Sequence, residues 1–373
     1  MKIGIPKEIK TMEHRVGITP EGVSSLVKNN HTVIIEKSAG EGSGFSDEDY
    51  RSAGALISNS PEEIYSSSDF IVKVKEPQPS EYKLLKKDQI LFTYLHLAVE
   101  KALTKELLNK RITGIAYETL QNSDGSLPLL TPISEIAGKM SIQVAANLLE
   151  NRNHGSGILL GGIAGVPKGK VLIIGAGHVG KNAAKIASGI GADVCVLDIN
   201  TDKLRNIENL LGSNIKTYIS SETKLKELTK EADVIIGAVL IPGHKAPCLI
   251  TEEMVKNMKK GSVIVDVSID QGGITETIDR IMTHDNPTFE KYGIIHYCVD
   301  NMTGSVARTA TIALTNESIK YIEEIADRGI IDTIKKNKAL AKGVNTFKGK
   351  LTNKGVAEAL QEEYTEITTH VGF

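Results

Sequence analysis

The sequence has little of what marks a secreted, zinc-binding or membrane-spanning protein. Its three cysteines, Cys195, Cys248 and Cys298, lie far apart and form no CxxC pair. This spacing favours a reducing compartment and argues against a zinc site. The apolar stretch 157–167 is too short and too rich in glycine to span a bilayer. The first ten residues, MKIGIPKEIK, lack the apolar core of a signal peptide. We therefore expect a soluble cytoplasmic protein.

The sequence also lacks an excess of charge of either sign. It contains 44 basic and 46 acidic residues, which gives a formal net charge of −2. Such a balance offers no electrostatic basis for binding nucleic acid or an anionic membrane surface. No repeat or low-complexity segment stands out among the 373 residues, and a chain of this length favours two domains.

The stretch 168–198 is the most informative part of the chain. Val171–Ile174 is a short apolar run rich in β-branched residues, which predicts a buried strand. The glycine turn GAGHVG follows, then a helical pattern of alanines, and then a second apolar run, Val194–Leu197, that ends on Asp198. Strand, G-x-G-x-x-G, helix, strand and acid in this order form the dinucleotide-binding fingerprint.

Each part of the fingerprint has a physical role. Gly175 allows the sharp turn off the strand, Gly177 lets a pyrophosphate approach the backbone, and Gly180 allows close packing of the helix on the sheet. The helix N-terminus offers free N–H groups to the phosphates. Asp198 can accept hydrogen bonds from a ribose 2′-hydroxyl and would repel a 2′-phosphate, which favours NAD over NADP. The alternative is a glycine turn that binds no ligand.

Strand and helix patterns alternate along the rest of the chain, which predicts an α/β fold with parallel sheets. In residues 1–128 we predict helices at Pro20–Lys28, capped by Thr19, and Glu100–Asn109, and strands at Lys2–Ile5, Thr32–Glu36, Asp69–Val74, Ile90–Leu97 and Ile112–Tyr117. After Asp198 we predict strands at Ile215–Ile219, Asp233–Val239, Ser262–Val267 and Ile294–Val299, which complete a six-stranded doubly wound sheet.

The remaining patterns are helical. Thr131–Glu150 predicts a helix that bridges the two domains, with Thr131 as its N-cap. From Thr311 onward strand patterns stop, and Asn316–Arg328 and Leu351–Leu360 predict helices that pack back on the N-terminal part. The predicted fold is thus two doubly wound domains: a Rossmann NAD-binding domain, 129–306, is inserted into a discontinuous substrate domain made of 1–128 and 307–373.

Two cationic residues in the N-terminal part are candidates for holding a substrate. Arg15 lies in a polar loop after the first strand, where its two-pronged guanidinium could bind a carboxylate, although a loop arginine is also commonly a surface charge. Lys75 stands at the carboxyl end of a predicted strand, where ligands bind. Its alternative role is that of a lysine that protects an edge strand from aggregation.

Two further residues could take part in proton transfer. His96 ends an apolar strand, and its ordinary pKa of about 6.5 suits a general acid or base near neutral pH. The alternative is a core histidine with its hydrogen bonds satisfied. Asp270 follows a strand of the nucleotide domain at its carboxyl end, although an aspartate before glycines is also a common turn residue.

Taken together, the motifs resemble the alanine dehydrogenase/pyridine nucleotide transhydrogenase family over essentially the whole chain. The resemblance rests on the fingerprint and on GIPKEIKTMEHRVGITP, VKVKEP, FTYLHLA, PLLTPISEIAGKM, GILLGG, DVSIDQGG and DNMTGSVARTAT. It implies reversible, NAD-dependent oxidative deamination of L-alanine to pyruvate and ammonia. Arg15 and Lys75 would bind the substrate, His96 would be the acid/base, and Asp270 of the nucleotide domain would complete the catalytic group. Arg15, Lys75 and His96 would face the cofactor across a cleft.

The resemblance also implies a set of residues that line the NAD site, many of them through the backbone. They are Ser134, His178, Asp198, Lys203, Ser220, Val239, Leu240, Val267, Ser268, Ile269, Asp270, Arg280, Val299, Asp300, Asn301 and Met302. Members that bind a divalent metal carry a glutamate and a histidine one helical turn apart. The matching pair here is Glu324 and Arg328, so we expect no such metal site. The resemblance further implies a homohexamer.

Three other functions stay open at this point. The nucleotide-binding subunit of a proton-translocating transhydrogenase would share the architecture, but it needs membrane partners. A lysine or saccharopine dehydrogenase would have a related fold with a different pocket. An NAD-dependent sensor would bind NADH without oxidising an amino acid.

Overall fold

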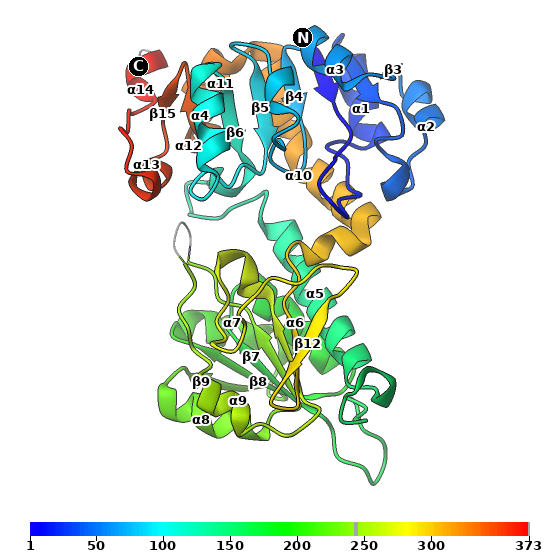
Figure 1. Ribbon diagram of the computed structural model, residues 1–373, viewed down its shortest axis with the longest axis vertical. Coiled ribbons are helices and arrows are strands. Elements are labelled where there is room, and N and C mark those ends of the chain that lie inside the picture. The colour runs from blue at the N-terminus through cyan, green and yellow to red at the C-terminus, as the bar shows by residue number, and fades with distance from the viewer. Residues whose placement is uncertain (242–244, 372–373) are drawn as a thin grey trace. The chain divides into compact units, whose positions relative to one another are not determined.

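The computed structural model describes residues 1–241 and 245–371, which divide into two compact units (Figure 1). The first unit comprises Met1–Ile133 and the chain from Gly304 onward, and the second comprises Ser134–Thr303. The second unit, green to yellow in Figure 1, is therefore inserted into the sequence of the first. Within the described residues, no helix is both long enough and apolar enough to cross a membrane.

The first unit is built on an eight-stranded sheet in the order β15-β14-β6-β5-β4-β1-β2-β3. Six strands run parallel: β1 (Lys2–Ile5), β2 (Thr32–Glu36), β3 (Leu56–Ser58), β4 (Phe70–Val72), β5 (Ile90–Thr93) and β6 (Thr113–Ala116). Two antiparallel strands, β14 (Val344–Phe347) and β15 (Lys350–Leu351), extend the sheet beyond β6. The carboxyl ends of β1, β4 and β5 therefore lie side by side.

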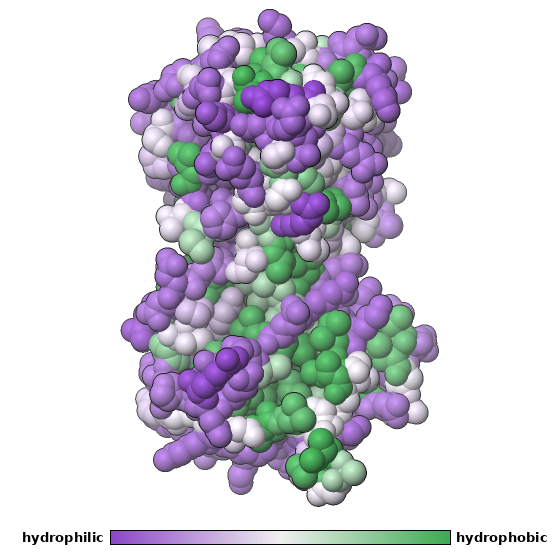
Figure 2. Space-filling view, turned by 90° about the vertical axis from the view of Figure 1, so that its right-hand side faces the viewer, coloured by the Kyte–Doolittle hydropathy of each residue, from purple (hydrophilic) through white to green (hydrophobic). Residues whose placement is uncertain are grey.

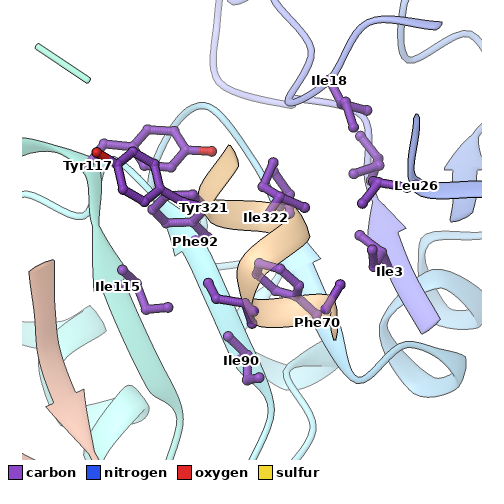
Figure 3. Packing of buried hydrophobic residues seen from close by; sticks show 14 of the residues in the cluster. Ile3, Ile18, Leu26, Phe70, Ile90, Phe92, Ile115, Tyr117, Tyr321 and Ile322 are labelled. Carbon is purple, nitrogen blue, oxygen red and sulfur yellow. The ribbon is translucent and has the colours of Figure 1, made fainter. Parts of the chain in front are cut away.

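The helices of this unit cover the sheet. They are α1 (Pro20–Lys28), α2 (Asp47–Ser52), α3 (Pro61–Ser67), α4 (Lys101–Asn109), α10 (Ala307–Arg328), α11 (Ile330–Lys336), α12 (Lys338–Gly343), α13 (Lys354–Leu360) and α14 (Thr368–Val371). The start of α1 is confirmed, because the Thr19 hydroxyl accepts a hydrogen bond from the N–H of Gly22. Figure 3 shows Phe70 and Phe92 of the sheet packed beside Ile322 of α10. The C-terminal segment thus completes the core of this unit.

Two predictions for the C-terminal segment are wrong. Strands do not stop at Thr311, because β14 and β15 follow it. The Thr346 hydroxyl accepts a hydrogen bond from the N–H of Gly114 and donates one to the carbonyl of Ile112, both at 3.0 Å. These contacts come from the distant β6 region, so local sequence carries no signal for them. The predicted helix at Asn316 also begins earlier, at Ala307.

The second unit contains a seven-stranded sheet in the order β12-β13-β11-β10-β7-β8-β9. Its parallel strands are β7 (Lys170–Ile174), β8 (Asp193–Asp198), β9 (Lys216–Ile219), β10 (Val234–Gly237), β11 (Val263–Asp266) and β13 (Ile294–Tyr297). Its helices are α5 (Thr131–Leu148), which starts in the first unit, and α6 (His178–Gly189), α7 (Thr201–Leu211), α8 (Glu222–Glu231) and α9 (Glu252–Lys256). The doubly wound α/β fold is confirmed.

Two local features differ from expectation. A seventh strand, β12 (Thr288–Lys291), pairs antiparallel with β13, in a segment where the sequence predicted no strand. Four partly exposed residues give too short a pattern to identify such an edge strand. Thr131 is the first residue of α5 rather than its N-cap, because its hydroxyl donates to the carbonyl of Leu127 instead of accepting from the helix.

Apolar side chains gather on part of the surface of the second unit. Figure 2 shows them as green residues in the lower part of the view. In the glycine-rich segment before β7, Leu159 and Ile163 are each 67% exposed and Val166 is also exposed. Contiguous exposed apolar residues of this kind commonly mark protein contacts.

A buried ionic network joins the loops that follow β1 and β4. The Lys73 ammonium lies 3.2 Å from the Oε2 atom of Glu8 and 2.9 Å from the Oε1 atom of Glu81. The Tyr65 hydroxyl donates to the same oxygen of Glu81 at 2.7 Å. Burial alone would lower the pKa of Lys73, but the carboxylates, Glu8 first, raise it above its ordinary value. The ammonium therefore stays charged inside the protein.

Replacement of Lys73 tests how strongly this network stabilises the first unit. We expect Lys73→Ala to lower the free energy of unfolding by about 3–5 kcal/mol, because two buried carboxylates lose their partner. The exposed ion pair of Lys86 with Asp69, at 3.9 Å, provides the matched control, and Lys86→Ala should cost less than about 1 kcal/mol. Urea unfolding followed by circular dichroism measures both, and equal small losses would contradict the network's role.

Candidate active site

Arg15 is buried in the loop between β1 and α1. Its side chain is 2% exposed, and its Nε and Nη2 atoms donate to the two carboxylate oxygens of Glu13 at 2.7 and 2.6 Å. This is the two-pronged geometry in which guanidinium groups bind carboxylates. The interpretation of Arg15 as a surface charge is therefore wrong. Arg15, Glu13 and Glu8 line a cavity of about 150 Å³ in the first unit.

Lys75 follows β4, which lies in the interior of the sheet, so the edge-strand interpretation is also wrong. The residue is 7% exposed, and its N–H donates to the Oε1 atom of Glu8 at 3.3 Å. The same oxygen accepts from the N–H of Val74 at 2.6 Å. Unlike Lys73, the Lys75 ammonium forms no hydrogen bond or ion pair with residues 1–241 or 245–371.

His96 lies beyond β5 rather than in it, because the strand ends at Thr93 and not at Leu97. Its backbone is left-handed, with φ of +50°. The imidazole stacks on the ring of Tyr94, with the two ring centroids 6.1 Å apart. The Tyr94 hydroxyl donates a hydrogen bond to the carbonyl of Leu129 at 2.6 Å. The side chain is partly exposed, and neither ring nitrogen bonds to a described residue, which is unlike a satisfied core histidine.

The three candidates follow the carboxyl ends of the neighbouring strands β1, β4 and β5. The electrostatic proximity of Lys75 and His96 shows in Glu76, a buried carboxylate after β4. Burial raises the pKa of Glu76, but Lys10, Lys75 and His96 together lower it below its ordinary value. A buried guanidinium, an ammonium with no ion pair to any described residue and an imidazole thus share one edge of the first sheet.

The glycine turn of the second unit has the geometry that its sequence predicts. Gly175 has a φ of +107°, and a Cβ atom on Gly180 would lie 1.8 Å from the carbonyl oxygen of Gly175. A Cβ atom on Gly177 would meet no heavy atom within 4 Å. Gly177 thus borders open space at the N-terminus of α6, where N–H groups are available to an anion.

Asp198 ends β8 and is held against the glycine turn. Its Oδ2 atom accepts a hydrogen bond from the N–H of Ala176 at 2.6 Å, and its Oδ1 atom accepts from the N–H of Asn200 at 2.8 Å. These bonds fix the carboxylate at the strand end, next to the turn. Its position suits an acceptor for ribose hydroxyls.

Most of the other residues expected at a nucleotide site lie beyond the carboxyl ends of the second sheet. These are Ser220 after β9, Val239 and Leu240 after β10, Val267, Ser268, Ile269 and Asp270 after β11, and Val299, Asp300, Asn301 and Met302 after β13. Such ends are where ligands bind in open α/β sheets. Asp270 is exposed in a 3-10 turn, η5 (Val267–Gln271).

The remaining expected nucleotide residues lie on helices or in a loop. Ser134 lies one helical turn before Gly138 on α5, and Gly138 packs directly on the carbonyl of Val179 at the start of α6. His178 is the first residue of α6, where burial and then Lys181 lower its pKa. Two others are basic: Lys203 lies on α7, and Arg280 stacks over the Phe289 ring at 4.7 Å.

Four acidic residues that sequence reasoning missed support the site: Glu8, Glu13, Glu118 and Asp266. Asp266, 1% exposed at the end of β11, accepts from the N–H groups of Ser268 at 3.1 Å and Ile274 at 2.8 Å. The Ser268 hydroxyl in turn accepts from the N–H of Val239 at 3.0 Å. An aspartate that ends an apolar run, as in VIVD, was the available signal for Asp266.

Family models match nearly the whole chain. The model described as "Alanine dehydrogenase/PNT, N-terminal domain" matches residues 4–137, and the one described as "Alanine dehydrogenase/PNT, C-terminal domain" matches residues 141–354. The chain belongs to the alanine dehydrogenase/PNT family. The two matched segments meet near the start of α5, where the two units also divide.

Individual members of the family agree with this assignment. An alanine dehydrogenase of Staphylococcus haemolyticus is 54% identical over 367 residues, which cover 98% of each chain. A solved L-alanine dehydrogenase matches with a TM-score of 0.93 at 47% identity, over 97% of this chain and 99% of that one. A transhydrogenase from Sinorhizobium meliloti, 23% identical with a TM-score of 0.82 over 94% and 100% of the chains, shares the fold.

The pair that matches the metal-binding positions of some family members forms an ion pair. Arg328 donates to the Oε1 atom of Glu324 at 3.2 Å, one turn apart on α10. The other oxygen of Glu324 accepts from the Asn337 amide at 2.7 Å. The Glu324 carboxylate is therefore engaged by protein donors.

The space beside Gly177 gives a direct test of the nucleotide site. Because a Cβ atom there meets no protein atom, Gly177→Ala should fold with an unchanged melting temperature. We expect its dissociation constant for NADH to rise at least about tenfold, since the methyl group blocks approach of the pyrophosphate. Fluorescence titration with NADH measures the loss. Gly189, which also has open space around its Cβ position, provides the control, and Gly189→Ala should bind NADH normally.

Proposed function

We propose that this protein is an NAD-dependent L-alanine dehydrogenase that interconverts L-alanine with pyruvate and ammonia. The observation that carries the proposal is the shared placement of Arg15, Lys75 and His96 beyond three neighbouring strands. Membership in the alanine dehydrogenase/PNT family supports the same activity. Bound NAD⁺ would accept the hydride from the alanine Cα.

In this proposal each residue of the first unit has a defined task. Arg15 binds the substrate carboxylate and so orients the Cα atom. Glu13 holds the guanidinium fork at 2.6–2.7 Å, which pre-orients it for this purpose. Lys75, which has no ion pair with a described residue, donates to the oxygen of the carbinolamine and pyruvate. Fixed orientation of this kind supplies several kcal/mol of barrier reduction.

His96 acts as the general base in the direction of deamination. It takes a proton from the substrate ammonium before hydride leaves Cα and passes that proton to solvent. It then takes a proton from the water that attacks the imine carbon and gives it to the amino nitrogen of the carbinolamine, so that ammonia leaves with the hydroxyl proton as pyruvate forms. In the reverse direction it returns those protons. A partly exposed imidazole without a hydrogen bond to a described residue can exchange protons with both substrate and solvent. We also assign Asp270 a catalytic role, as the family resemblance implies.

The residues proposed to bind the nucleotide in the second unit determine which cofactor binds. Asp198 favours NAD over NADP because its carboxylate accepts ribose hydroxyls and repels a 2′-phosphate. We also expect a cytoplasmic homohexamer, as the family resemblance implies, and the exposed apolar residues of the second unit offer contact surface for it. Analytical ultracentrifugation measures the oligomeric state.

The activity itself is tested by NADH formation with a panel of L-amino acids. We expect L-alanine to give the highest kcat/KM with NAD⁺, and much lower rates with NADP⁺. Higher activity with NADP⁺ would contradict the role of Asp198. Binding of NADH without oxidation of any amino acid would instead indicate a sensor.

His96 is tested separately. We expect His96→Ala to lose about 10²–10⁴-fold in kcat because the general base is removed. Its affinity for NADH should be unchanged, since the nucleotide residues belong to the second unit. His154, an exposed histidine of that unit, provides the control, and His154→Ala should keep normal turnover. Turnover of the His96 variant at the wild-type rate would contradict the assignment.

A further inference from the structure

The backbone at His96 adopts a conformation that needs support. Its φ of +50° lies in the left-handed region, which costs energy for any residue with a Cβ atom. The chain reaches this conformation three residues after β5 ends at Thr93, and the N–H of Tyr94 still bonds to the carbonyl of Val74 at 3.2 Å. The N–H groups of Leu95 and His96 therefore need acceptors from elsewhere.

Glu118 supplies these acceptors. Its Oε1 atom accepts from the N–H of His96 at 2.7 Å and from the N–H of Leu95 at 3.2 Å, and its Oε2 atom lies 3.3 Å from the same Leu95 nitrogen. Glu118 belongs to the 3-10 turn η3 (Tyr117–Thr119), directly after β6. Thr93 at the end of β5 pairs with Ala116 at the end of β6, so the sheet itself brings the carboxylate to the turn.

The other side of the turn is also held. The carbonyl of His96 accepts from the N–H groups of Val99 at 3.0 Å and Glu100 at 3.3 Å. With Glu118 on its N–H and Tyr94 stacked on its ring, His96 is constrained at the backbone on both sides and at the side chain. Tyr94, Val99 and Glu100 belong to the same chain segment as His96, whereas Glu118 comes from the turn after β6.

We propose that Glu118 is a positioning residue for His96. It fixes the left-handed backbone that aims the imidazole, and it does so as a hydrogen-bond acceptor for two successive N–H groups rather than through its charge. This inference rests on the proposed role of His96 as the general base. It extends the catalytic machinery to a residue that acts through the backbone of His96.

Three substitutions of Glu118 separate the effects of its hydrogen-bond acceptor, its side-chain length and its charge. Glu118→Ala removes the acceptor, and we expect kcat to fall at least about tenfold while the dissociation constant for NADH changes less than about twofold. Glu118→Gln keeps an amide oxygen in the place of Oε1, so kcat should stay within about threefold of wild type. Glu118→Asp keeps the charge but is one methylene shorter, and it should resemble the alanine variant. The Gln and Asp pair tests the proposal even if Glu118→Ala fails to fold.

Two controls show whether the effect passes through His96. Asp49 also accepts a backbone N–H in the first unit, from Ser46 at 2.7 Å, and Asp49→Ala should leave kcat unchanged. In a His96→Ala background, Glu118→Ala should cause no further loss of turnover, because the residue to be positioned is gone. Multiplicative losses in the double variant, or a glutamine variant as impaired as the alanine variant, would overturn the proposal.

Crystal structures of the Gln and Asp variants give a measure that does not depend on turnover. The φ angle of His96 should stay near +50° in Glu118→Gln and leave the left-handed region in Glu118→Asp. If the wild-type protein oxidised no alanine while the φ angles changed as expected, the proposed function would fail but the positioning role would stand. An unchanged φ in both variants would overturn the positioning role whatever the activity.

Discussion

The first unit depends on one buried carboxylate, that of Glu8. One of its oxygens accepts the N–H groups of Val74 and Lys75, and the other pairs with the ammonium of Lys73. The loop after β1 is thereby tied to the loop after β4. Since these two loops carry Arg15 and Lys75, the same contact sets the distance between the groups proposed to bind the substrate. Lys73 compensates the buried negative charge of Glu8, so the Lys75 ammonium is not needed for this.

Carboxylates that accept backbone N–H groups occur in both units at the ends of parallel strands. Glu118 after β6 accepts two N–H groups from the loop after β5, and Asp266 at the end of β11 accepts two from its own following loop. Asp198 at the end of β8 accepts one from the glycine turn and one from its own following loop. Loops leave the sheet at these ends, so their N–H groups lose ladder partners. Hydrogen bonds to charged acceptors contribute about 1.5–3 kcal/mol each, enough to hold a loop in one conformation. These loops thus gain rigidity without apolar packing.

Sequence patterns predicted those parts of the structure that local residues determine. The bounds of β1, β2 and α1 are confirmed, because β-branched runs and the Thr19 cap act over a few residues. The strands β12, β14 and β15 were missed because two to four residues carry too little pattern, and their pairing comes from distant segments. The supporting acids Glu8 and Glu118 were missed for a related reason: their partners are 66 and 22 residues away in the chain. Arg15, Lys75 and His96 could be singled out because a polar residue beside an apolar strand is a local feature.

The central claim is that Glu8 organises the substrate groups of the first unit independently of the nucleotide groups of the second. Steady-state oxidation of L-alanine by Glu8→Ala tests it most directly, with folding checked by circular dichroism. The account predicts that the KM for L-alanine rises at least about tenfold, a loss of roughly 1.4 kcal/mol, while the KM for NAD⁺ stays within about twofold. A folded variant with a wild-type KM for L-alanine, or one in which both KM values rise equally, would contradict it.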